Sequence, residues 1–159
     1  MANGRYDNQS PRGPGRPGGD RQNWRDDTPL SNIVQEDIQF AGQIDPQLFN
    51  EIAKRCAKTI GDNQKRNKPS QLRRFYDELV MWTAKVEQNP QRFDEYRPFI
   101  LMLNAKAAYA DGRELVDSNF VKLLDHCLRQ AADAKTLNYA KLFFEAFLGF
   151  YKEVRPRES

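Results

Sequence analysis

The sequence has 159 residues, a length that fits one domain, with 39% apolar residues, 30% charged residues and a formal net charge of +3. Its longest apolar run, Phe99 to Leu103, is far shorter than the roughly 20 residues that a membrane-spanning helix needs, which excludes an integral membrane protein. Because no apolar segment follows Met1, we expect no secretory signal and predict a cytoplasmic protein in which Cys56 and Cys127 are reduced.

The first 30 residues differ in composition from the rest of the chain. They contain five of the nine glycines and four of the nine prolines, and their only large aromatic side chains are Tyr6 and Trp24. Such a segment buries too little apolar surface to offset the entropy lost on ordering. We therefore predict a disordered tail over residues 1–30, a linker leading into the domain over 31–44, and a helical domain over 45–155.

Apolar residues beyond the tail recur at helical spacing. Helices are predicted over residues 46–60, 70–88, 98–112, 118 to about 131 and about 137–154, with a short helical turn near 92–96. Ser70 and Ser118 are the expected N-caps, and Pro98 is placed in the first turn of its helix. The last helix has an apolar arc wider than one packing contact requires, so it is central or shared with a partner. The fold class is all-α, a compact bundle of about five amphipathic helices preceded by the disordered N-terminal tail.

The residues that could support catalysis are few and dispersed. His126, the single histidine, falls opposite Phe120 on the helical wheel, which indicates a solvated surface residue, whereas Cys127 falls on the apolar face. The cysteines and the histidine lack the spacing of a zinc site, and the glycines at 13–19 lack the GK[ST] of a P-loop. We therefore predict no enzyme, no metal and no cofactor.

Positive charge is concentrated in residues 52–74, which carry eight Lys and Arg and a single Asp. Its members lie on the polar face of the first helix, in the loop that follows and in the first turn of the next helix; they are Lys54, Arg55, Lys58, Lys65, Arg66, Lys68, Arg73 and Arg74. Cations in a first turn oppose the helix dipole, so folding alone would prefer acids at Arg73 and Arg74. This pattern favours an anion site, and a nucleic-acid backbone is the natural polyanion.

The predicted helix over 98–112 has a second unusual charge. Lys106 falls in the middle of the face formed by Phe99, Met102 and Leu103, with Arg113 two turns further on. Lys106 either snorkels along the edge of the core or faces a ligand, and both alternatives remain open.

Three segments carry a family resemblance. Residues 68–79 (KPSQLRRFYDEL), residues 99–110 followed by Gly112 and Arg113, and residues 143–152 resemble the small all-helical subunit of type III-A CRISPR effector complexes, the Csm complexes. The similarity extends over roughly residues 45–153 in the same order.

The resemblance implies a non-enzymatic subunit of an antiviral defence complex, present in several copies stacked along guide and target RNA. Its implied partners are single-stranded target RNA, the crRNA-containing Csm complex with its backbone and large subunits, and neighbouring copies, but no membrane. The resemblance assigns target-backbone contacts to Lys68, Gln71, Arg73, Arg74, Lys106 and Arg113. The candidates that rest on charge clustering alone are Lys54, Arg55, Lys58, Lys65 and Arg66.

A second class of protein remains possible from the sequence. The chain could be a helical protein-protein adaptor whose basic patch docks an acidic partner. RNA binding that depends on salt and ignores sequence would separate the two classes.

Overall fold

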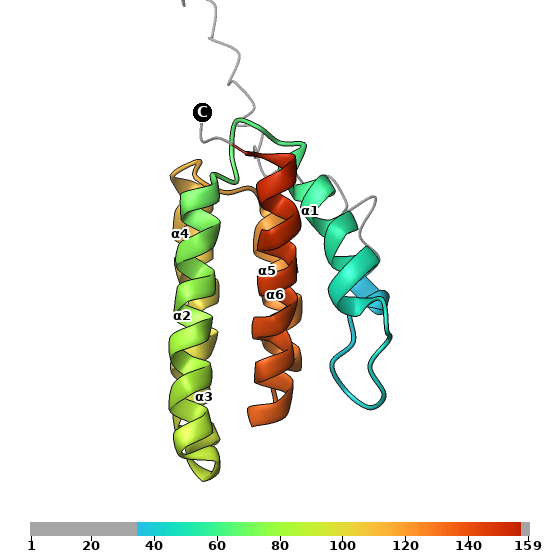
Figure 1. Cartoon of the computed structure of the whole chain (residues 1–159). Helices are drawn as coiled ribbons and strands as arrows, with labels where there is room; N and C mark the ends of the chain where they lie inside the picture. The colour runs from blue at the N-terminus through green and yellow to red at the C-terminus, as the bar shows by residue number, and fades with distance from the viewer. Residues whose placement is uncertain (1–34, 157–159) are drawn as a thin grey trace, which may run out of the picture.

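The computed structural model describes residues 35–156, and these residues form helices and no strand (Figure 1). The α-helices are α1 (Ala53–Gly61), α2 (Pro69–Gln88), α3 (Phe93–Leu101), α4 (Leu103–Gly112), α5 (Ser118–Gln130) and α6 (Ala134–Val154). Short 3-10 turns occur at Gln35–Asp37 and Pro90–Arg92, and a π-helical turn, Leu48–Ile52, leads into α1. The predicted all-α fold is confirmed, and the predicted tail over 1–30 lies outside the described residues.

The last helix is the centre of the bundle. Figure 1 shows α6 between α2 and α1, and α6 also packs against α5. Its side chains Phe143, Phe147 and Tyr151 are at most 1% exposed. The wide apolar arc of the sequence is therefore used within one chain, because three neighbouring helices cover different sides of α6.

The helix starts differ from those predicted, because other residues provide the N-caps. α2 begins at Pro69, whose missing N–H is tolerated in a first turn, rather than after Ser70. The cap of α5 is Asp117, whose carboxylate accepts from the Phe120 N–H, rather than Ser118. α6 begins three residues before Leu137, because Asp133 and Thr136 form a reciprocal capping box that also lowers the pKa of Asp133 through hydrogen bonding.

The predicted single helix over 98–112 is divided into α3 and α4, so the prediction is wrong here. α3 begins at Phe93, which places Pro98 inside the helix instead of in its first turn. α3 ends at Leu101, and Met102 is a turn residue that separates it from α4, which starts at Leu103. Leu103 is buried, but Phe99 and Met102 are 55% and 53% exposed, so they do not belong to a core face as the helical wheel predicts.

The end of the predicted linker is packed onto α5. Ile38 and Phe40 are at most 1% exposed, and the Gln130 side-chain amide donates to the Ile38 carbonyl (2.7 Å) and accepts from the Phe40 N–H (2.9 Å). Nε2 of His126 lies 2.9 Å from the same Ile38 carbonyl. His126 is therefore half-buried instead of freely solvated as predicted, because the segment before α1 packs against one side of it. Cys56 and Cys127 are free thiols in the core.

Deleting residues 1–30 is expected to leave the melting temperature of the protein within about 2 °C of the full chain. The segment removed is rich in Gly and Pro, and the packed chain described above starts beyond it, at Ile38. Thermal unfolding followed by circular dichroism would measure the change. A fall of more than about 4 °C, roughly 1 kcal/mol for a domain of this size, would show that the tail contributes to the folded state.

Within residues 35–156, none of the helices combines the length and the hydropathy that a bilayer crossing requires.

Candidate nucleic-acid interface

The loop that joins α1 to α2 is built around Asn67. This residue is fully buried and adopts a left-handed conformation with φ 55°, which asparagine tolerates better than most residues. Its Nδ2 donates to the Ile60 carbonyl (3.0 Å) at the end of α1, and its Oδ1 accepts from the Asp117 N–H (2.8 Å) before α5. The side chain of Asn67 therefore ties the cationic loop to two helices.

A buried arginine from the end of α6 holds the same loop. Arg155 is 5% exposed and donates through Nη1 to the carbonyls of Arg66 (2.6 Å) and Asn67 (2.9 Å), and through Nη2 to that of Gln64 (3.1 Å). The Tyr151 hydroxyl also donates to the Asn67 carbonyl. The backbone of residues 64–67 is therefore fixed from the inside by donors that lie more than 80 residues away in sequence.

Charge clustering along the chain does not indicate Arg155, because this arginine lies in a segment where acids and bases balance. Lys152, one turn earlier on α6 and exposed, was missed for the same reason. Arg155 and Lys152 lie near the cationic segment because the end of α6 packs against the loop between α1 and α2.

Ion pairs engage some of the predicted site residues. Lys106 Nζ lies 2.8 Å from Glu78 on α2, and Arg73 Nε lies 3.0 Å from Asp77. Arg66 is half-buried and pairs with Asp111 (3.1 Å) and Glu114 (3.5 Å), and Arg55 pairs with Asp37 (3.5 Å). The predicted residues outside any carboxylate pair in the described part of the chain are Lys54, Lys58, Lys65, Lys68, Arg74 and Arg113.

The sequence left open whether Lys106 runs along the edge of the core or faces a ligand. In the structure it forms an ion pair with Glu78. Its side chain is 53% exposed and bridges from α4 to α2 instead of running along a core edge. The exposed Phe99 ring stacks on Trp82 of α2, with ring centroids 6.1 Å apart. Phe99 of α3 and Lys106 of α4 therefore both contact α2, the first by ring stacking and the second by an ion pair.

The predicted residues lie in four places on the molecule: on α1, in the loop between α1 and α2, on the side of α2 that faces Lys106, and on the side of α2 that faces α6. The cations of α1 are separated from those of α2, because α6 lies between the two helices (Figure 1). Arg74 is one turn before Glu78, so with Gln71 it shares the side of α2 that faces Lys106, and Arg113 continues along α4. Arg73 points about 100° away from Arg74, toward α6. The structure therefore brings the two signature segments together but leaves Lys54, Arg55 and Lys58 apart.

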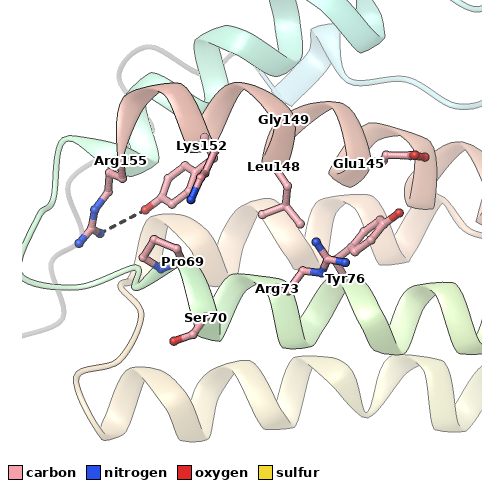
Figure 2. Close-up of a pocket in the computed structure, with 10 residues that line it drawn as sticks. Pro69, Ser70, Arg73, Tyr76, Glu145, Leu148, Gly149, Lys152 and Arg155 are labelled. Carbon is pink, nitrogen blue, oxygen red and sulfur yellow. Dashed lines mark hydrogen bonds between the residues drawn. The ribbon is translucent and has the colours of Figure 1, made fainter. Parts of the chain in front are cut away.

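An open groove of about 690 Å³ runs between α2 and α6 (Figure 2). Figure 2 shows Leu148 directed from α6 toward α2, and Arg73 and Tyr76 on the facing side of α2. The Arg73 guanidinium lies 5.4 Å from the centroid of the Tyr76 ring. Burial and the nearby Glu145 carboxylate raise the pKa of Tyr76, so its hydroxyl is neutral at physiological pH. The lining residues are Pro69, Ser70, Arg73, Tyr76, Glu145, Leu148, Gly149, Tyr151, Lys152 and Arg155.

The two cysteine thiols are buried and stay protonated. Burial raises the pKa of Cys56 to about 12 and that of Cys127 well above its ordinary value, so neither thiol ionises near neutral pH. Over residues 35–156 no three His, Cys, Asp or Glu side chains gather in a way that could hold a metal ion. Exposed lysine and arginine side chains on a fixed loop and a helix start can form charge-assisted hydrogen bonds with an anion.

A family model described as Csm2 Type III-A matches residues 43–157, a range that includes all six α-helices and every predicted site residue. No curated protein and no solved structure matches the chain.

Proposed function

The chain belongs to the Csm2 type III-A family, and from this premise we propose that it is a non-catalytic subunit that binds the target RNA backbone without sequence preference. Family membership makes it a small-subunit protein of type III-A CRISPR complexes. In our proposal several copies stack along the guide and target RNA, and the backbone and large subunits of the complex are further partners. A cytoplasmic setting and the absence of a cofactor stay predictions.

One observation carries the proposal of RNA binding. Along the loop and the start of α2, the cations Lys65, Lys68 and Arg74 have no carboxylate partner among residues 35–156, although acids are available nearby for Arg66 and Arg73. A folded protein gains little from such unpaired, clustered positive charges. A phosphate diester backbone supplies closely spaced negative charges and would neutralise them.

The proposed contacts favour the RNA backbone over the bases. Lys and Arg side chains at an exposed helix start can pair with phosphate oxygens through charge-assisted hydrogen bonds. One copy neutralises few phosphates, so its affinity for RNA is weak. Stacked copies on a single RNA gain avidity, because each further contact is intramolecular.

Salt titration of the full chain with single-stranded RNA tests this function. The slope of log K against log salt should be about −0.7 per phosphate contacted, and it should be similar for unrelated RNAs of equal length. Affinities that differ by about 100-fold between such RNAs at one salt concentration, about 2.7 kcal/mol, would require base-specific contacts and contradict the proposal.

The adaptor alternative predicts a different result in the same titration. An adaptor that docks an acidic protein would show no measurable RNA binding at low salt, yet it would be retained by an acidic peptide. That combination of results would favour a protein partner for the basic surface.

A further inference from the structure

The groove between α2 and α6 contains groups that the backbone contacts proposed above do not use. Leu148 points from α6 toward α2, Tyr76 points from α2 toward the part of α6 that carries Glu145, and Gly149 contributes no side chain to the lining (Figure 2). Its volume of about 690 Å³ is within the range of small-molecule sites. The groove also begins at Pro69 and Ser70, so it is continuous with the cationic loop.

The charge and shape of the groove restrict what it can hold. Arg73 and Lys152 are cations at its exposed rim, and among residues 35–156 Glu145 is the one acid that lines it. The partner of Arg73, Asp77, is 59% exposed, and such surface pairs are weak enough to be exchanged for a phosphate. The groove therefore suits an anion that also has an apolar part.

The pair formed by Arg73 and Tyr76 adds a preference for a planar group. A guanidinium over a phenol ring presents two flat surfaces at one edge of the groove, and Leu148 provides an aliphatic surface from α6. Single-stranded nucleic acids bind proteins by stacking bases on such groups while cations hold the phosphates. An acidic protein segment would use the cations but would leave the flat surfaces without a matching partner.

We infer that the α2–α6 groove accepts one nucleotide of the bound RNA, with the base against Tyr76 and Leu148 and a phosphate toward Arg73 and Lys152. This inference rests on the proposed RNA-binding function and adds a base contact to it. Stacking tolerates every base, so the contact is compatible with binding that ignores sequence.

Gly149 allows the groove to be filled without disturbing the core. It is exposed, and a Cβ added at this position meets no atom within 4 Å. Gly149→Leu adds an aliphatic side chain at the exposed rim of the groove, and Gly149→Ala is the matched control because it adds the Cβ alone. Both replace a glycine inside a helix, so neither should lower the melting temperature.

The test measures binding of the full-length variants to single-stranded RNA by fluorescence anisotropy at fixed salt. Gly149→Ala should bind as the unmodified chain does, and Gly149→Leu should bind roughly fivefold or more weakly. An RNA of equal length with abasic positions keeps the phosphates but removes the bases. The unmodified chain should lose affinity for it, and Gly149→Leu should bind both RNAs equally.

Two outcomes would overturn the inference while leaving RNA binding intact. In one, Gly149→Leu binds intact RNA as tightly as Gly149→Ala, and abasic RNA binds the unmodified chain as intact RNA does. In the other, Gly149→Leu binds RNA normally but no longer co-purifies with the other subunits, which would assign the groove to a protein. Loss of salt-dependent RNA binding in the unmodified chain would instead refute the proposed function itself.

Discussion

Replacing Arg155 by glutamine is expected to lower the free energy of unfolding by about 3 kcal/mol and to loosen the cationic loop. The buried guanidinium satisfies the carbonyls of Gln64, Arg66 and Asn67. A shorter, uncharged side chain cannot reach all three, and each buried carbonyl left without a donor costs about 1 to 3 kcal/mol. The expected total lies well below the sum, because the Asn67 carbonyl keeps the Tyr151 hydroxyl as a donor and water can enter the end of the bundle and replace other lost donors.

Denaturant unfolding of Arg155→Gln beside Arg129→Gln would measure this effect. Arg129 is a matched control because its side chain is 75% exposed and makes a single surface ion pair, with Asp125. Amide exchange should accelerate first in the loop at residues 62–68, before the helices are affected. A loss of stability no larger than that of Arg129→Gln would contradict the role assigned to Arg155.

Helical periodicity predicted the class of this fold because burial is patterned along each helix. The apolar arc of α6 was readable in the sequence, and it indicated the central position that this helix occupies. Helix ends were harder to predict from the sequence, because several residues near each boundary could act as caps. The position of Pro98 was predicted wrongly because α3 begins five residues earlier, at the buried Phe93. The proline therefore lies inside the helix.

Part of the candidate site could be predicted from residues that are close in sequence, and the rest depends on tertiary contacts. Clustering of Lys65, Lys68 and Arg74 is visible within ten residues of sequence. Arg155 holds the loop and Lys152 lines the groove because the end of α6 packs against the loop between α1 and α2. No pattern in a single sequence specifies that packing contact. The pairing of Lys106 with Glu78 likewise needs the packing of α4 beside α2.

Replacing Arg73 and Arg74 together by alanine is expected to weaken binding of single-stranded RNA about tenfold, or about 1.4 kcal/mol, without unfolding the domain. Both side chains are exposed, and the single ion pair of Arg73 is a surface pair, so stability should change by less than about 0.5 kcal/mol. If each arginine contacts one phosphate, the salt slope should become less steep by about 1.4. RNA titrations and a thermal melt of the double variant measure both effects.

The matched control for this pair is Arg92→Ala with Arg129→Ala, which removes the same charge from two exposed positions away from the loop. Because all four arginines contribute equally to net charge, a general attraction between protein and RNA would weaken both double variants alike. A local site predicts the loss in the Arg73 and Arg74 variant alone.

Arg73 and Arg74 also point to different sides of α2. The losses of binding free energy in the two single variants should therefore add if the RNA crosses the start of the helix and contacts both sides. A melt collapse of the double variant with unchanged affinity per folded molecule would instead make these arginines structural.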